Sequence, residues 1–93
     1  MPIQSFACSE TENLFNTGST VKFTAIQRTA ERKLAMLHAA HELKDMKSPP
    51  GNKLHPLTGD RVGQHSIRIN DQYRVCFIWT SAGPEEVEIT DYH

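Results

Sequence analysis

The clearest pattern of apolar and polar positions lies in the second quarter of the chain. Residues spaced four, four, three and four apart are Ile26, Ala30, Leu34, Leu37 and His41. This spacing places them on one stripe of a helix, while the charged residues Arg28, Glu31, Arg32 and Lys33 point elsewhere. We predict a helix from about Ala25 to about Lys44, opened by capping-box spacing at Thr24 and Gln27.

A shorter helix is predicted before it. Ser9 and Glu12 also have the spacing of a capping box, and a helix through Leu14 and Phe15 would end at Gly18. Ahead of it, residues 2–6 alternate weakly between apolar and polar, which predicts a short first strand.

The pattern changes to a period of two in the last third of the chain. Residues 48–52 contain two prolines and a glycine and form a loop. Three alternating stretches follow His65, and their apolar positions are Ile67, Ile69, Tyr73, Val75, Phe77, Trp79, Val87 and Ile89. Turn residues at 70–72 and 81–84 favour consecutive antiparallel pairing. The prediction is a small α+β fold, a single domain over residues 1–93, with two N-terminal helices on one face of an antiparallel sheet.

Composition adds limits to this picture. A chain of 93 residues forms one domain, and its net charge of −1 with a pI near 6.5 argues against indiscriminate binding of polyanions. Residues 44–74 nevertheless hold 6 Lys or Arg against 3 Asp or Glu, which is typical of a phosphate partner. No apolar run predicts a membrane span and no secretory signal is visible. Cys8 and Cys76 are expected to be reduced thiols.

Two arginines are candidates for binding a phosphate. Arg68 and Arg74 come from neighbouring predicted strands and share the face turned away from the helices. Two guanidinium groups can fit the oxygens of one phosphate, and Arg61 and Lys53 would add charge from the edge. The alternative is that these arginines form cross-strand ion pairs with Glu86, Glu88 and Asp91.

Acid–base groups complete the candidate site. Cleavage of RNA at its own 2′-hydroxyl needs a proton acceptor, a proton donor and fixed positive charge, and no cofactor is expected. His55, Asp91, Tyr92 and His93 are candidates for the first two roles. A zinc site made of Asp91, His93 and His55 is the alternative, although the spacing matches no zinc motif. His38 and His41 are expected to be solvated or at the edge of the core, and Cys76 is not expected to act as a nucleophile.

Several motifs together resemble a known family. They are Lys53-Leu54-His55-Pro56-Leu57, Gly59-Asp60-Arg61, Ser66-Ile67-Arg68-Ile69-Asn70, Gln72-Tyr73-Arg74-Val75, Asp91-Tyr92-His93 and the helix segment Glu31-Arg32-Lys33-Leu34-Ala35-Met36-Leu37. The chain resembles the HigB toxins of bacterial type II toxin–antitoxin systems, within the RelE/ParE superfamily, and among them the GraT-like members.

The resemblance implies a cytoplasmic, ribosome-dependent mRNA endonuclease that cuts codons in the decoding site. It also implies a HigA-type helix-turn-helix antitoxin, which together with the toxin binds operator DNA. The family's loop histidine corresponds to His55, its phosphate-contacting arginine to Arg74, and its terminal residues to Asp91, Tyr92 and His93. Arg68 matches less firmly, because some relatives have their basic residue at the position of Asn70.

Two departures from the family favour a weaker or more conditional nuclease. Some HigB proteins have a lysine where this chain has Thr58, and the pI is low for a protein that contacts ribosomal RNA. Two other functions remain alternatives: a ParE-like inhibitor that binds DNA gyrase, and a module that only sequesters its partner. Strand parity also raises a question. In an unbroken last strand Asp91 and His93 would face the core, so the strand bends or ends after Thr90, or only Tyr92 faces the arginines.

Overall fold

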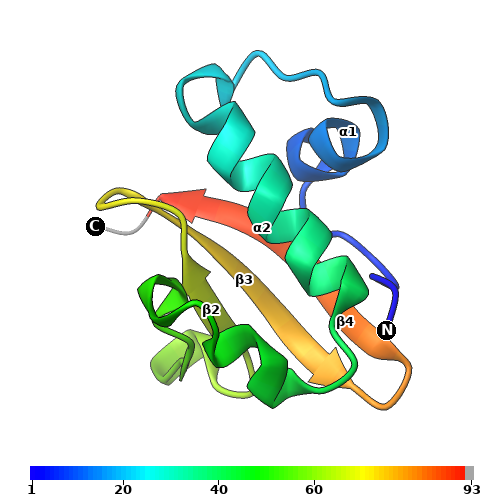
Figure 1. The fold of residues 1–93 in the computed structure, drawn as a ribbon, viewed down its shortest axis with the longest axis vertical. Coiled ribbons are helices and arrows are strands. Elements are labelled where there is room, and N and C mark those ends of the chain that lie inside the picture. The colour runs from blue at the N-terminus through cyan, green and yellow to red at the C-terminus, as the bar shows by residue number, and fades with distance from the viewer. Residues whose placement is uncertain (92–93) are drawn as a thin grey trace.

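A computed structural model describes residues 1–91 of the chain (Figure 1). Two α-helices come first, α1 at Ser9–Thr17 and α2 at Gln27–Ala39. Four strands follow: β1 at His55–Pro56, β2 at His65–Arg68, β3 at Tyr73–Thr80 and β4 at Gly83–Asp91. Short 3-10 turns occupy Thr24–Ile26, Leu43–Lys47, Pro50–Asn52 and Gly59–Arg61. No helix within residues 1–91 has the length and apolar character needed to cross a membrane.

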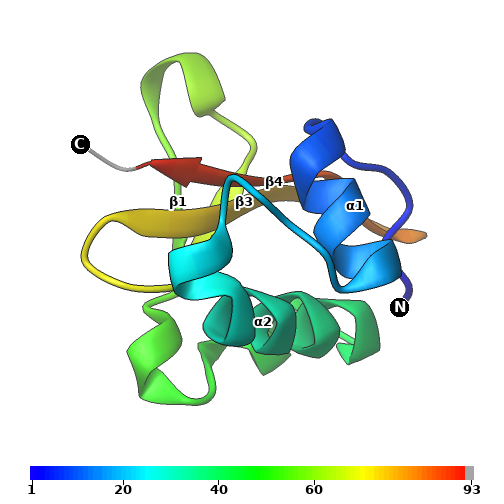
Figure 2. The same cartoon turned by 90° about the horizontal axis from the view of Figure 1, so that it is seen from above.

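The sheet confirms the predicted α+β fold and the consecutive antiparallel pairing of β2, β3 and β4, whereas β1 lies where no strand was predicted. The strand order is β1-β2-β3-β4, and Val75 lies opposite both Ile67 and Ile89. Helix α2 crosses one face of the sheet, while α1 packs beside α2 and β4 (Figures 1 and 2). The loop between β1 and β2 lies on the opposite side of the sheet from α2 (Figure 2).

The core forms where the helical stripe meets the inner face of the sheet. Ala30, Leu34 and Leu37 are fully buried, as are Ile67, Val75, Phe77 and Val87 of the strands. Each large apolar side chain buried in this way stabilises the fold by about 1.5–3 kcal/mol. The predicted stripe is therefore confirmed from Ile26 to Leu37.

The predicted end of the long helix is wrong. Helix α2 stops at Ala39, because Ala40 adopts an extended backbone with φ −65° and ψ 140°. The side chain of Asp45 then accepts hydrogen bonds from the backbone amides of His41 and Glu42, at 3.0 and 3.1 Å. These bonds start a separate 3-10 turn, and His41 is exposed rather than part of the buried stripe.

Neither predicted capping box forms. Ser9 already lies inside α1, where its hydroxyl donates to Glu10, and Cys8 is the N-cap residue. The hydroxyl of Thr24 donates to the carbonyls of Thr20 and Val21, and a 3-10 turn at Thr24–Ile26 precedes α2, which begins at Gln27. A capping box does join Glu42 and Asp45. The predicted end of the first helix is confirmed, because Gly18 has φ +72° and donates to the carbonyl of Leu14.

The predicted first strand at residues 2–6 is wrong, since only Phe6 makes an isolated bridge, to Val87. The segment instead covers the outer edge of β4. The amide of Gln4 donates to the carbonyl of Pro84 at 2.7 Å, and the amide of Val87 donates to the carbonyl of Ser5 at 3.1 Å. The hydroxyl of Thr11 in α1 accepts from the amide of Ile89 at 3.0 Å. An edge that would otherwise be open to pairing with other chains is thereby closed.

The contact between this segment and Gly83 makes a stability prediction. Gly83 has φ +131°, and a Cβ atom there would lie 2.3 Å from the carbonyl oxygen of Pro2. We expect Gly83→Ala to lower the free energy of unfolding by about 2–3 kcal/mol, measured by urea denaturation. Gly51→Ala is the control, because no atom lies within 4 Å of its Cβ position. Equal losses in the two variants would contradict the prediction.

A buried polar contact joins α2 to the segment between the helices and the sheet. Lys33 was expected to point away from the core, but it is only 7% exposed and its Nζ donates to the side-chain oxygen of Asn52. Asn52 is fully buried and its amide donates to the carbonyl oxygens of Met46 and Ser48 at 3.1 and 3.3 Å. Burial lowers the pKa of Lys33. The loop predicted at residues 48–52 is thus tied to the core instead of lying free on the surface.

Candidate functional site

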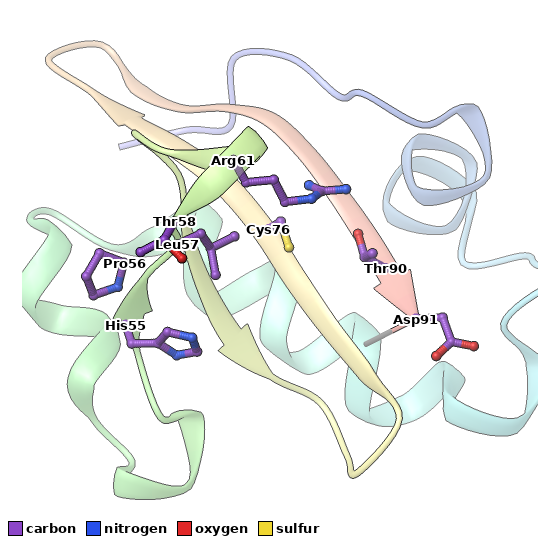
Figure 3. Close-up of a pocket in the computed structure, with 8 residues that line it drawn as sticks. All are labelled: His55, Pro56, Leu57, Thr58, Arg61, Cys76, Thr90 and Asp91. Atoms are coloured by element: carbon purple, nitrogen blue, oxygen red, sulfur yellow. The ribbon is translucent and has the colours of Figure 1, made fainter. Parts of the chain in front are cut away.

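An open cavity of about 630 Å³ lies on the face of the sheet turned away from α2 (Figure 3). Strand β1 and the β1–β2 loop form one wall, and β3 and β4 form the floor and the other side. The residues that line it are His55, Pro56, Leu57, Thr58, Arg61, Cys76, Thr90 and Asp91. Three of the predicted site residues, His55, Arg61 and Asp91, are therefore brought to one cavity.

The two strand arginines share the outer face, as strand parity predicted. Arg68 lies directly opposite Arg74 in the register of β2 and β3, and Arg74 lies opposite Thr90 of β4. The three residues form one row across the sheet, and Thr90 joins that row to the cavity. Side chains directly opposite each other on one face have Cβ atoms about 5 Å apart. The side chains of Arg68 and Arg74 thus leave the sheet from neighbouring positions, although neither residue lines the cavity itself.

Within residues 1–91, ion pairs on this face bear out the cross-strand alternative for Glu88. Arg68 pairs with Asp71 of the β2–β3 turn rather than with an acid on β4. Arg61 does pair with β4, because its Nη1 lies 2.8 Å from Oε1 of Glu88 and also donates to Gln64 at 3.1 Å. The hydrogen bond that Arg61 donates to Glu88 raises the pKa of Arg61. Lys53 is exposed and lies outside the residues that line the cavity.

The β1–β2 loop covers part of the outer face. Its base is closed by the amide of Leu57, which donates to the carbonyl of Gln64 at 2.8 Å. The Arg61 side chain extends from the loop across β3 towards β4 (Figure 3). Cys76 lies below it on the outer face, yet it is only 2% exposed. Burial raises the pKa of the Cys76 thiol, so the thiolate needed for nucleophilic attack is disfavoured.

One histidine, His55, lies at the β1 side of the cavity. His55 opens β1, and its Nδ1 is 3.2 Å from the carbonyl oxygen of Lys53. Because a carbonyl only accepts, Nδ1 carries the hydrogen and the neutral ring keeps its lone pair on Nε2. His65 begins β2 opposite Pro56, and its pKa is lowered by burial and by the nearby His55. The His65 ring stacks on the buried Phe77 on the inner face of the sheet, so His65 does not line the cavity.

The C-terminal residues are described only in part. Strand β4 continues to Asp91, which lies opposite Tyr73, so the strand does not end after Thr90. The Asp91 carboxylate accepts a hydrogen bond from Nε2 of Gln72 at 2.9 Å. Tyr92 and His93 lie outside the described residues, and their roles stay predictions. Within residues 1–91, no group of three His, Cys, Asp or Glu side chains is placed to hold a metal ion.

Thr58, Cys76 and Thr90 line the cavity but were not predicted as site residues. The alternation of β3 and β4 does place Cys76 and Thr90 on the outer face. This alternation does not, however, predict that the β1–β2 loop folds over Cys76 and Thr90. Thr58 was singled out only as a departure from the family pattern, and the structure places it in the cavity wall.

Comparison with known proteins provides an independent view of the chain. Residues 4–93 match the family described as RelE-like toxin of type II toxin-antitoxin system HigB. Toxin HigB-1 from Vibrio cholerae serotype O1 is 43% identical over 56 residues, which cover 60% of this chain and 59% of that protein. An uncharacterized protein from Haemophilus influenzae is 36% identical over 52 residues, which cover 56% of this chain and 52% of that protein. The chain thus matches between half and three-fifths of the length of these relatives.

A solved structure supports the architecture. The YoeB/ParE toxin from Agrobacterium tumefaciens superposes with a TM-score of 0.56 at 22% sequence identity, and the alignment covers 100% of both chains. At this level of identity the likeness concerns the fold. It agrees with two helices packed on a four-stranded antiparallel sheet.

Proposed function

This chain belongs to the HigB-like family of RelE-like toxins from type II toxin–antitoxin systems, and from that premise we propose that it is an endoribonuclease that cleaves mRNA on the ribosome. The reaction is attack of an RNA 2′-hydroxyl on the adjacent phosphate with departure of the 5′-oxygen. It inhibits translation, and its place of action is the cytoplasm, where ribosomes translate.

The observation that carries the proposal is the row of Arg68, Arg74 and Thr90 beside the cavity. As the 2′-oxygen attacks, negative charge grows on the phosphate oxygens. Donors that are already oriented lower the energy of that state without further reorganisation. Arg74 and Arg68 supply these donors and their positive charge, and Arg61 and Lys53 add positive charge at the edge.

Acid and base roles are divided between two histidines. The Lys53 carbonyl orients Nδ1–H of His55, so Nε2 is the atom that takes up a proton from the substrate. From the sequence we propose His93 as the second histidine, which protonates the leaving oxygen. Tyr92 stacks on a base or assists proton transfer, and Asp91 orients its neighbours from the end of β4.

The test is to incubate the protein with programmed ribosomes and to map the ends of the mRNA. Cleavage by the parent protein that is lost in His93→Ala supports the proposed function. DNA gyrase and plasmid DNA are assayed in parallel, because a ParE-like toxin would stabilise gyrase–DNA breaks. Intact mRNA together with such breaks would show that the protein inhibits gyrase and is not an mRNA endonuclease.

A cognate antitoxin follows from the same premise. We expect a HigA-type helix-turn-helix protein to bind this toxin and to carry it to operator DNA. Co-expression with that protein is expected to suppress mRNA cleavage in the ribosome assay. Operator binding by the isolated toxin would contradict the view that DNA is contacted only through the antitoxin.

The absence of a lysine at position 58 makes a prediction about activity. Thr58 lines the cavity wall and is exposed, so Thr58→Lys adds a cation close to the substrate phosphates. We expect mRNA cleavage about threefold to tenfold faster and stronger growth arrest, because one added charge stabilises the transition state. Asn16→Lys on α1 adds the same charge at an exposed helix position. Equal rates in the two variants would count against a weakened nuclease.

A further inference from the structure

The ion pair between Arg61 and Glu88 connects the loop wall of the cavity to β4. Their atoms are 2.8 Å apart, and the side chains are 38% and 24% exposed. Arg61 belongs to the 3-10 turn Gly59–Arg61, while Glu88 lies opposite Cys76 on the outer face. The pair therefore passes above Cys76 at the edge of the proposed RNA site.

Glu88 brings negative charge to the face that carries the arginine row. Arg74 and Cys76 are two residues apart on β3, and their partners on β4 are Thr90 and Glu88. Glu88 is thus the diagonal neighbour of Arg74 on the same face, a separation of about 7–8 Å. A phosphate placed on the arginine row approaches a carboxylate, and it meets an Arg61 already bound to that carboxylate. Glu88 opposes RNA binding by repulsion and by competition for a donor.

We propose that Glu88 is a specificity-determining residue that weakens binding of free single-stranded RNA by engaging Arg61. The inference rests on the proposed function and deepens it. Free RNA has to displace the Glu88 carboxylate from Arg61, and only the binding energy of a single phosphate is available to do so. An mRNA held on a ribosome presents its phosphodiester at a high effective concentration, so it competes successfully for Arg61. Glu88 thus restricts the toxin to RNA that is already positioned.

The distribution of charge along the chain agrees with weak binding of free RNA. Residues 75–93 hold 4 acidic residues and no Lys or Arg, and the net charge is −1. A basic surface would bind any RNA through its phosphates. Here the arginines are grouped, and Arg61 pairs with Glu88 of β4, while Arg68 pairs with Asp71 of the β2–β3 turn. The alternative role for the pair is a strut that holds the β1–β2 loop over the sheet.

Binding of a short single-stranded RNA with 2′-O-methyl groups, which cannot be cleaved, separates the two roles. Fluorescence anisotropy is measured for the parent, Glu88→Gln and Glu31→Gln at several salt concentrations. Glu31 belongs to α2 on the other side of the sheet, so its substitution changes the net charge equally but not at the cavity (Figure 2). Glu88→Gln removes the negative charge and keeps a side-chain oxygen that can accept a hydrogen bond from Arg61.

We expect Glu88→Gln to bind the RNA about tenfold more tightly near 0.1 M salt, and Glu31→Gln to stay within about twofold of the parent. The slope of log K against log salt is expected to steepen by about 0.7, the value for one further phosphate contact on a single strand. Adding Arg61→Gln to Glu88→Gln is expected to abolish the gain. On the ribosome, Glu88→Gln is expected to cleave mRNA at least as fast as the parent.

Three results would overturn the proposal: RNA binding by Glu88→Gln no tighter than by Glu31→Gln, a gain that persists without Arg61, or loss of the fold in Glu88→Gln. The last result would make the pair a strut. Failure of the nuclease is seen separately, because the binding assay uses RNA that cannot be cleaved. If the parent protein leaves mRNA intact on ribosomes, the proposed function is overturned. Tighter RNA binding by Glu88→Gln would still show that Glu88 weakens binding of free RNA.

Discussion

Arg74→Ala is expected to cleave mRNA on the ribosome at about one hundredth of the parent rate or less, which is the usual cost of removing one oriented donor from a developing negative charge. Arg74 is half-buried on the central strand β3, between Arg68 and Thr90. Its position is therefore set by two neighbouring strands. Rates are measured from the accumulation of mapped mRNA ends under single-turnover conditions, so that product release does not mask the chemical step.

Two further variants sharpen this test. Arg74→Lys keeps the charge but loses the planar fork, so we expect a rate between those of the parent and the alanine variant. Arg28→Ala removes an exposed arginine from α2, on the other face of the sheet, and is expected to leave the rate unchanged within about twofold. Thermal unfolding of each variant shows whether the fold is retained. A folded Arg74→Ala protein with the parent rate would exclude Arg74 from the proposed reaction.

Asn52→Leu is expected to lower the free energy of unfolding by about 3–5 kcal/mol, because the buried ammonium of Lys33 loses its acceptor. The carbonyl oxygens of Met46 and Ser48 lose a donor as well. The cost applies to the charged form of Lys33. Burial has already lowered its pKa, so the loss is expected to shrink as the pH rises towards that value. Urea denaturation at neutral and alkaline pH measures both effects.

The double variant Lys33→Met with Asn52→Leu provides the control. Replacing both polar partners by apolar residues of similar size removes the buried charge, so part of the stability is expected to return. The carbonyl oxygens of Met46 and Ser48 still lack their donor, and recovery is therefore incomplete. A double variant less stable than Asn52→Leu alone would contradict a dominant role for the unpaired ammonium.

The fold was largely predictable because the two periodicities are strong. Ile26 to Leu37 lie on one helical face, and Ile67, Val75 and Ile89 alternate with polar residues along the strands. The helix boundaries failed because capping boxes identified by spacing alone compete with other hydrogen bonds. Thr24 bonds back to Thr20, and Asp45 bonds to the amides of His41 and Glu42. The local sequence does not determine which of these hydrogen-bond partners is selected.

The candidate site was predictable only where strand parity determines it. Arg68 and Arg74 fall on one face in any consecutive antiparallel arrangement with this turn. The pairing of Arg61 with Glu88, the burial of Cys76 and the place of Thr58 depend on how residues 57–64 fold back over the sheet. Glu88 was named among several acids that could pair with the arginines. Sequence provided no reason to choose Arg61 as its partner.

The sequence by itself determined the α+β class, the buried stripe of α2, the consecutive pairing of β2, β3 and β4 and the face on which Arg68 and Arg74 lie. These features follow from periodicity and turn chemistry, which act over a few residues. Only the tertiary structure decided that Lys33 is buried against Asn52, that residues 2–6 cover the edge of β4, and that the β1–β2 loop builds a cavity beside the arginines. Each of these contacts joins segments far apart in the chain, and its partner is selected by packing, which no local pattern encodes.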